Sequence, residues 1–388
     1  MICRKTDDSQ YDVGSFIDVI IYLICFGVSV FFAWIAEKTR NRIVFYLFSV
    51  LSILVTVLLA GLRDVSIGID TLNNYGNTWQ VAVGARTTWH FLELFHRSFR
   101  AKEYLYAALI GFSANVFHDY HVFLTLVHLI IVGGVYIGAF RLRRYASPSL
   151  VLLFFYLFYY NHSLNVFRQY LAMAILFAGA ADILERRYRR FTFILIIAIL
   201  FHNTAVIGVL PLFTFQLLYP RNRLKAVSLP KRLLLSALII VGAVLFVPFG
   251  SLLLKMGLLG QKYEFYFEAE GTNTYLIPRV LVLLELCGII IYRRSWKKYK
   301  VFSGFFAYCT FAFGVLYQIA PSIPYGKRIP AYFSLINLVS LAILSQCQKN
   351  RNNRIIVRCI TIAAALSYWL LMYAHYNTSR TIPYILGV

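Results

Sequence analysis

The sequence predicts an all-α polytopic membrane protein, and three observations support that fold class. The chain of 388 residues is 60% hydrophobic and 14% charged, with a mean hydropathy of +0.68, which is outside the usual range of soluble domains. Its apolar residues fall into runs that approach the roughly 20 residues needed to cross a bilayer. Between these runs, most of the 38 Lys and Arg residues gather in short clusters, at 38–42, 141–144, 186–190, 221–232, 293–300 and 349–358.

The basic clusters also predict which loops face the cytoplasm. Lys and Arg in short loops between spans stay on the cytoplasmic side, and about 12 spans with the N-terminus outside put every cluster there. Both termini then face the periplasm or the cell exterior of a bacterial cytoplasmic (inner) membrane, and 1–388 forms a single integral membrane domain. The predicted spans are 14–36, 42–62, 121–140, 148–162, 166–185, 191–203, 205–219, 233–254, 275–292, 301–320, 329–347 and 355–374.

The apolar stretch 104–117 is predicted to be a re-entrant or interfacial helix. Its length of about 14 residues is short for a span, and a crossing there would move the cluster at 141–144 to the outside. The main outer loop region is therefore 63–120, and this helix lies near its end.

The pair of spans 191–203 and 205–219 is also short. At a rise of about 1.5 Å per residue, two full crossings need more chain than this pair supplies. The turn at His202-Asn203-Thr204 is therefore expected below the outer surface. A broken helix at that depth requires protein or a water-filled cavity to satisfy its backbone.

Composition and motif content exclude several function classes. The net charge of +22 lies mostly in clusters that topology explains, so we expect the lipid bilayer, and no nucleic acid, as a partner. His118 and His121 have only Asp119 nearby, and the cysteines have no metal-binding spacing, so no zinc site is predicted. The chain lacks a Gly-rich phosphate loop, a GxSxG elbow and an HExxH motif. We therefore expect no metal, no cofactor and no nucleotide donor.

Arginines on the predicted outer side are the first candidate site residues. They break the positive-inside trend, and the informative ones are Arg63, Arg168, Arg279, Arg328 and Arg380. Each can be a snorkelling anchor. Guanidinium groups gathered at a membrane edge also suit a phosphate or pyrophosphate, which they hold through paired hydrogen bonds. Charge at the membrane boundary therefore predicts a binding function.

Acidic residues are scarce, 16 in all. Asp70 follows Gly68, which permits a tight turn, and it either caps a helix or serves as a general base or a carboxylate for a sugar hydroxyl. Asp182 and Glu285 lie toward cytoplasmic span ends, where we expect them to pair with arginines. The acids on the predicted outer side are Asp64, Asp70, Glu93, Glu103, Asp119, Glu264, Glu268 and Glu270.

His202 and the aromatic residues each have two interpretations. His202 is either a hydrogen-bonded packing residue or a base, and the helix break beside it favours the second role. The 28 tyrosines and 33 phenylalanines fit an aromatic belt at the membrane interfaces. Tyr75 and other tyrosines beside the outer loops are also placed to contact sugar rings.

Five segments in order resemble signatures of EpsG-type polysaccharide polymerases. Ile69 replaces the usual Thr of one signature and Thr204 the usual Ser of another, and neither change removes a titratable group. The segments are Gly61-Leu62-Arg63 with Gly68-Ile69-Asp70-Thr71 and Tyr75, then Phe167-Arg168-Gln169-Tyr170-Leu171-Ala172, Phe201-His202-Asn203-Thr204-Ala205, Arg328-Ile329-Pro330-Ala331-Tyr332-Phe333 and Pro383-Tyr384.

The resemblance implies a GT-C-like fold and a Wzy-like glycosyltransferase. Such proteins join undecaprenyl-pyrophosphate-linked oligosaccharide repeat units on the outer face of the cytoplasmic membrane, with a second lipid-linked unit as acceptor. The product class would be O antigen, capsule or exopolysaccharide, and a chain-length co-polymerase is the implied partner.

The same resemblance suggests roles for individual residues. Asp70 is expected to bind or deprotonate the acceptor hydroxyl, and His202 is the alternative general base. Arg63 is expected either to help bind the pyrophosphate or to hold Asp64 and Asp70 in position. The residues expected to bind pyrophosphate or sugar are Arg168, Gln169, Arg279, Arg328, Tyr75 and Tyr332.

Other function classes remain as alternatives. A lipid-linked glycan ligase differs only in its acceptor. A flippase for lipid-linked oligosaccharide would also hold a pyrophosphate, but it should contain repeated halves, which the sequence lacks. An acyltransferase acting on surface sugars is a further class, but the sequence shows no clear His-based acyl-transfer pattern.

Overall fold

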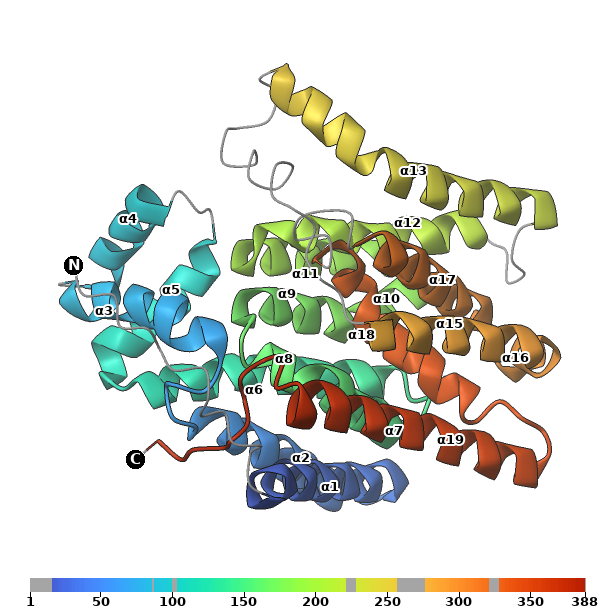
Figure 1. Cartoon of the computed structure of the whole chain (residues 1–388), viewed down its shortest axis with the longest axis horizontal. Helices are drawn as coiled ribbons and strands as arrows, with labels where there is room; N and C mark the ends of the chain where they lie inside the picture. Colours follow the sequence, from blue (N-terminus) through green and yellow to red (C-terminus); the bar gives the residue numbers. More distant parts are fainter. Residues whose placement is uncertain are drawn as a thin grey trace.

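The structure is a computed structural model that describes residues 16–85, 87–99, 103–220, 228–256, 276–320 and 328–387. The regular elements within these ranges are all helices, joined by turns and loops, and an isolated backbone bridge joins Arg63 to Leu386. Most of the long helices lie side by side along the long axis of the molecule (Figure 1). The all-α prediction is therefore confirmed for the described residues.

The first part of the chain forms a hairpin and a group of short helices. The α1–α2 hairpin turns at Asn41, whose side chain accepts hydrogen bonds from the amides of Ile43 and Val44 at 2.8 and 3.3 Å and so caps α2. The elements are α1 (Phe16–Lys38), α2 (Arg42–Gly61), the π-helix η1 (Thr71–Gly76), α3 (Asn77–Gly84), α4 (Thr88–Phe99), α5 (Tyr104–Phe112) and the π-helix η2 (Ser113–Phe117).

The middle of the chain supplies the most buried helices. Helix α9 packs against α6, α11 and α18, so it lies at the centre of the bundle. The elements are α6 (Tyr120–Arg141), α7 (Pro148–Phe155), η3 (Tyr156–Tyr160), α8 (Asn161–Ser163), α9 (Phe167–Ala178), α10 (Ala180–Leu184), α11 (Tyr188–Phe201), the 3-10 helix η4 (Asn203–Gly208) and α12 (Val209–Leu218).

The last part of the chain closes the bundle. Helix α17 packs against both α15 and α18, and α19 packs against η3. The elements are α13 (Leu229–Lys255), α15 (Leu276–Ile291), α16 (Arg293–Tyr299), α17 (Ser303–Ile319), α18 (Arg328–Leu344), α19 (Arg351–Trp369) and the π-helix η7 (Leu370–His375).

Five helices in the described part of the chain are long and apolar enough to cross a membrane. The shorter apolar helices include 104–117, so the prediction of a short element there is confirmed, whereas its re-entrant or interfacial position stays a prediction. The count of about 12 spans and the GT-C-like arrangement also stay predictions. The long apolar helices are Ile17–Lys38, Arg42–Gly61, Tyr120–Arg141, Phe167–Leu184 and Arg351–His375.

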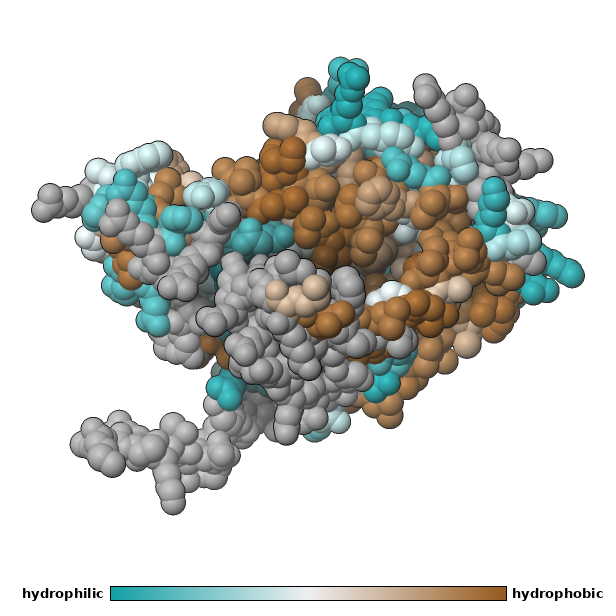
Figure 2. All heavy atoms as spheres, turned by 90° about the horizontal axis from the view of Figure 1, so that it is seen from above, coloured by the Kyte–Doolittle hydropathy of each residue, from teal (hydrophilic) through white to brown (hydrophobic). Residues whose placement is uncertain are grey.

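The two ends of the bundle differ in composition. Figure 1 places α3, α4 and α5 at one end, together with the end of the C-terminal segment, and α16 at the other. The basic clusters 141–144, 293–300 and 349–358 begin at or after the ends of α6, α15 and α18, toward the α16 end of the bundle (Figure 1). Figure 2 shows hydrophilic atoms at both ends and along the upper edge of the view, with a broad hydrophobic surface between them. This pattern is typical of a bundle whose middle contacts lipid.

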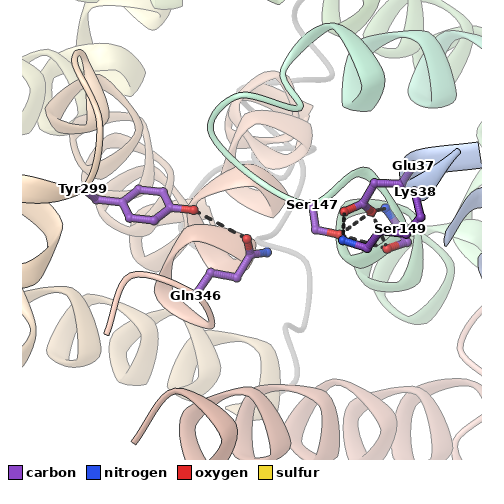
Figure 3. Close-up of polar contacts among 6 residues, drawn as sticks. All are labelled: Glu37, Lys38, Ser147, Ser149, Tyr299 and Gln346. Atoms are coloured by element: carbon purple, nitrogen blue, oxygen red, sulfur yellow. Dashed lines mark hydrogen bonds and ion pairs between the residues drawn. The ribbon is translucent and has the colours of Figure 1, made fainter. Parts of the chain in front are cut away.

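Polar side chains tie the helices together at the α16 end (Figure 3). The Glu37 carboxylate accepts hydrogen bonds from the hydroxyls of Ser147 and Ser149 at 2.6 and 2.8 Å. Tyr299 donates to Gln346 at 3.5 Å. These contacts join α1 to the start of α7, and α16 to the residues that follow α18.

One of the two expected carboxylate–arginine pairs is present. Asp182 is fully buried and accepts hydrogen bonds from Nη1 and Nη2 of Arg141, both at 2.7 Å. Such a bidentate pair satisfies a charge that would otherwise be costly to bury. Glu285 was expected to pair likewise, but that prediction is wrong: it accepts a hydrogen bond from the Asn337 amide at 2.9 Å. Its helix places it in the bundle interior, below the level of the basic loops.

Two glycines on α6 let α9 approach closely, as small residues four apart do in membrane helices. A Cβ at Gly138 would lie 2.4 Å from Cδ1 of Phe177 and 2.7 Å from its carbonyl oxygen, and a Cβ at Gly134 would lie 2.9 Å from the Ala174 carbonyl oxygen. In contrast, a Cβ at Gly133 would meet no atom within 4 Å.

We expect Gly138→Ala to destabilise the protein. Overpacking of this kind costs about 1–3 kcal/mol, so the unfolding temperature of the purified protein should fall by several degrees. Gly133→Ala on the same helix is the matched control, and it should be neutral or slightly stabilising. Equal unfolding temperatures for the two variants would refute the close packing of α6 on α9.

The C-terminal segment folds back along the end of α2. The Gly387 amide donates to the Leu62 carbonyl at 2.8 Å, and the Asp64 amide donates to the Ile385 carbonyl at 2.8 Å. The amide of Gly68 donates to the Arg380 carbonyl at 2.9 Å. These bonds hold the loop after α2 in place, and that loop leads directly to Asp70.

Candidate active site

Glu103 is the centre of a polar cluster at the α5 end of the bundle. It precedes α5 and is 3% exposed. Its Oε2 accepts a hydrogen bond from Nη1 of Arg168 at 2.7 Å, and its Oε1 lies 2.6 Å from Nδ1 of His202. The Asn203 amide points to the same Oε1 at 3.4 Å. One carboxylate therefore connects two residues that were predicted separately from sequence.

Helix ends place these side chains together. Arg168 lies in the first turn of α9, and its guanidinium lies over the Tyr106 ring of α5 at 5.6 Å. His202 has φ −155° and ψ 121°, which is extended backbone between α11 and η4. The predicted helix break is thus confirmed, and it turns the imidazole toward Glu103. The arginine keeps 37% of its side chain exposed, so the cluster is accessible on one side.

Tyr75 and Asp70 lie beside this cluster. The Tyr75 ring stacks on Phe167 with centroids 4.3 Å apart, and the residue is only 5% exposed. Burial raises the pKa of the Tyr75 hydroxyl, the positive charge of Arg168 opposes that rise, and the negative charges of Asp70 and Glu103 add to it. Both acids are therefore within electrostatic reach of one hydroxyl. The stacked, buried ring packs the site and leaves little face for a sugar.

The start of α18 borders the cluster from another side. Gln169 donates to the backbone carbonyl of Arg328 at 3.1 Å, and the hydroxyls of Thr204 and Tyr332 lie 2.7 Å apart. Residues 168–169, 202–204 and 328–332, which are far apart in sequence, are therefore joined at one end of the bundle. Arg279 is connected differently: its Nε donates to Oε1 of Gln318 on α17 at 2.9 Å.

Arg63 lies inside the protein beneath the cluster. It is 0% exposed, donates to the carbonyls of Ala60 and Leu164, and lies over the Phe167 ring at 5.4 Å. Its backbone also forms the bridge to Leu386. These contacts join α2, the turn before α9 and the C-terminal segment, so the arginine positions the site from within.

Gly68 has a backbone reason to be glycine. Its φ is +99°, a region that other residues rarely adopt. A Cβ there would also lie 2.5 Å from Oδ1 of Asn165 and 2.7 Å from Oγ1 of Thr71. The loop before Asp70 therefore packs against the turn before α9, which brings the two signature segments together.

Sequence reasoning counted Glu103 among the outer acids but gave it no role. Two signals were available: it directly precedes an apolar helix, and it is one of few acids in a strongly basic chain. Its partners could not be inferred, because they follow it by 65 and 99 residues. Among the described residues, no group of three or more His, Cys, Asp or Glu side chains is arranged to hold a metal.

The protonation of Glu103 gives an expected pH dependence. Burial raises its pKa, but hydrogen bonds and charge from His202 and Arg168 outweigh burial, so the pKa lies below the ordinary value of 4.5. A lowered pKa stabilises the folded state above the unfolded value, and that stability is lost as pH falls through the folded value. Thermal unfolding should therefore show a loss of stability below about pH 4.5 that Glu103→Gln lacks. Parallel profiles for the two proteins would refute the pairing.

Comparison with known proteins supports the family resemblance. The model of the EpsG family matches residues 46–386, which is most of the chain and includes every residue of the cluster. A search of curated proteins and a search of solved structures each gave no match. With its apolar helices, the chain is a multi-pass membrane protein that belongs to the EpsG family.

Proposed function

We propose that this protein is a polymerase that joins undecaprenyl-pyrophosphate-linked oligosaccharide repeat units on the outer face of the bacterial cytoplasmic membrane. Family membership supports a polysaccharide-polymerase type of function. The observation that supports this specific reaction is the Glu103 cluster. In it, the Glu103 carboxylate lies 2.7 Å from Nη1 of Arg168 and 2.6 Å from Nδ1 of His202.

His202 is the general base in this proposal. Glu103 at Nδ1 favours the tautomer whose proton lies on that nitrogen, which leaves Nε2 free of a proton and able to accept one. A histidine oriented by a carboxylate is a common general base. Asp70, within reach of the same cluster, holds a hydroxyl of the acceptor sugar.

The reaction forms one glycosidic bond and breaks one bond to phosphate. The acceptor hydroxyl attacks the anomeric carbon of the donor's first sugar, and its proton passes to Nε2 of His202. The bond between that carbon and the pyrophosphate oxygen breaks, and undecaprenyl pyrophosphate leaves with the bonding electrons. Preorganised cations that meet this developing charge lower the barrier.

Arg168, Arg328 and Arg279, which lies on α15, are the residues proposed to meet that charge. Arg168 keeps part of its guanidinium exposed, and Gln169 fixes the backbone at Arg328. Arg63, which is buried, supports the site from below. Tyr332 lies beside Thr204 and borders the substrate, while Tyr75 packs beneath Arg168.

The proposed side of the membrane follows from the positions of the Glu103 cluster and of the basic residues at opposite ends of the bundle. The cluster lies at the end opposite α16 and its basic residues (Figure 1). If the basic loops are cytoplasmic, the cluster and both chain termini face the periplasm or cell exterior. A chain-length co-polymerase is the proposed protein partner, and the product class is O antigen, capsule or exopolysaccharide.

The test uses purified protein in lipid nanodiscs with a short lipid-linked repeat unit. We expect longer lipid-linked products, separated on a gel, and their loss with His202→Gln. Transfer to a non-lipid acceptor alone would indicate a ligase. Movement of the unit across a liposome bilayer without elongation would indicate a flippase. Either of the last two results would overturn the polymerase proposal.

A further inference from the structure

A long cavity of about 490 Å³ lies between α9, α15, α17, α18 and α19. Aromatic and aliphatic side chains make up most of its wall. Tyr159, Tyr170, Leu281, Phe313, Leu341 and Tyr368 are typical of them. It is separate from the Glu103 cluster, whose members do not line it.

The cavity extends along the helices from the end that holds the cluster. On α18 its lining runs from Ala331 to Leu344, and at 1.5 Å per residue this spans about 20 Å. At the end of the cavity toward the Glu103 cluster, Ala331 is one turn from Arg328, and Pro278 adjoins Arg279. A ligand in the cavity would therefore have its top beside two of the arginines proposed to bind pyrophosphate.

The cavity borders helices that face lipid. Leu284 on α15 is 59% exposed and Ile360 on α19 is 61% exposed, and both residues also line the cavity. Exposed leucine and isoleucine on an apolar bundle indicate contact with acyl chains. An apolar chain can thus enter from the bilayer between α15 and α19, without passing through water.

The polar pair in the wall is consistent with an apolar occupant. Glu285 and Asn337 are 7% and 5% exposed, and each has one oxygen, Oε1 and Oδ1, without a partner. In the described part of the chain Glu285 makes no ion pair, and an unpaired buried carboxylate is costly. A protonated Glu285 still accepts the Asn337 amide hydrogen bond at 2.9 Å and carries no charge, which removes that cost.

We propose that this cavity binds the isoprenoid tail of the lipid-linked substrate, with its pyrophosphate beside Arg279 and Arg328. This assignment rests on the proposed function, which supplies the polyprenyl carrier. The aromatic and aliphatic walls hold a hydrocarbon tail through van der Waals packing, which drives association inside a bilayer where no water is displaced. This packing also orients the pyrophosphate toward the site.

The test is photolabelling of the full-length protein in nanodiscs with a polyprenyl phosphate that carries a photoreactive group on an isoprene unit close to the phosphate, so that the group lies within the length of the cavity. We expect labelled peptides from α15, α18 and α19, located by mass spectrometry, and competition by undecaprenyl phosphate but not by phosphatidylglycerol. Labelling spread evenly over the lipid-facing helices, or equal competition by both lipids, would overturn the proposal.

Matched variants sharpen the test. Ala364 lines the cavity, whereas Ala363 beside it on α19 is exposed and does not. Ala364→Trp should reduce cavity labelling at least about tenfold, and Ala363→Trp should leave it unchanged. Glu285→Gln, which keeps the shape without a charge, should also retain labelling. Loss of labelling in Glu285→Gln would show that the occupant needs a carboxylate, which a hydrocarbon tail does not.

These outcomes are separable from those of the polymerase test. Elongation without cavity labelling would refute the tail site alone. Cavity labelling without elongation would refute the polymerase and retain a polyprenyl-binding site.

Discussion

Arg168→Ala is expected to abolish long polymer and to lower the rate of elongation by about 10²–10³-fold, the usual effect of losing one group that meets developing charge. Arg168→Lys should also be strongly impaired. Lysine keeps the charge, but it lacks the planar fork that holds Glu103 and a phosphate oxygen at the same time. Chain length on a gel and the elongation rate in nanodiscs measure both effects.

The control for Arg168 separates a chemical role from a structural one. Arg351→Lys changes an arginine at the opposite end of the bundle, and it should leave chain length unchanged. Arg168→Lys keeps a positive charge beside Glu103, so it should retain the Glu103–His202 contact and unfold within a few degrees of the parent. Long chains made by Arg168→Ala would end its assignment to the pyrophosphate.

His202→Gln is expected to lower the elongation rate by about 10²–10⁴-fold, which is typical of losing a general base. Glu103→Gln should have a smaller effect, about 10–100-fold, because the imidazole remains but loses its oriented tautomer. It should also shift the pH profile of the rate, whereas loss of packing alone would not. The double variant should be no slower than His202→Gln, since the two residues act as a unit.

Asp70→Asn distinguishes the two candidate bases. If Asp70 holds the acceptor, this variant should raise the KM for the acceptor more than it lowers kcat. A variant with unchanged kinetics would remove Asp70 from the site. If Asp70→Asn abolished turnover while His202→Gln did not, the general base would be Asp70. The Glu103–His202 pair would then not take part in proton transfer.

The helical architecture could be predicted from sequence because it depends on local signals. Runs of apolar residues, basic loops and one break at His202 each lie within a few neighbouring residues. The close packing of α6 on α9 depends on Gly138 meeting Phe177, residues 39 positions apart in the chain. Hydropathy carries no such information, so the helices could be placed along the chain but not against one another.

The candidate site was predicted in part. His202 and Arg168 were identified because a polar residue in an apolar segment is costly and therefore informative. Glu103 was given no role because that role depends on Arg168 and His202. These two residues are distant in sequence, and only the fold brings them to Glu103. Tyr75 was expected to contact sugar, but it is buried on Phe167, since a tyrosine beside a loop can point either way.

For Glu285, the sequence predicted an ion pair that the described residues do not form. Arginines are common near the cytoplasmic ends of the spans, so an ion pair was the natural expectation. About two turns of helix separate it from Arg293 and Arg294, which begin α16, and at about 1.5 Å per residue the side chains are too far apart to pair. The amide of Asn337 is its partner instead.

Sidedness is tested most directly by cysteine accessibility in intact cells. In a variant with all six native cysteines replaced, single cysteines at Asp70, Arg168 and Arg351 are treated with a membrane-impermeant maleimide. Positions 70 and 168 should react in intact cells, and position 351 only after permeabilisation. Labelling of 351 from outside, with 70 and 168 reachable only from the cytosol, would contradict an active site on the outer face.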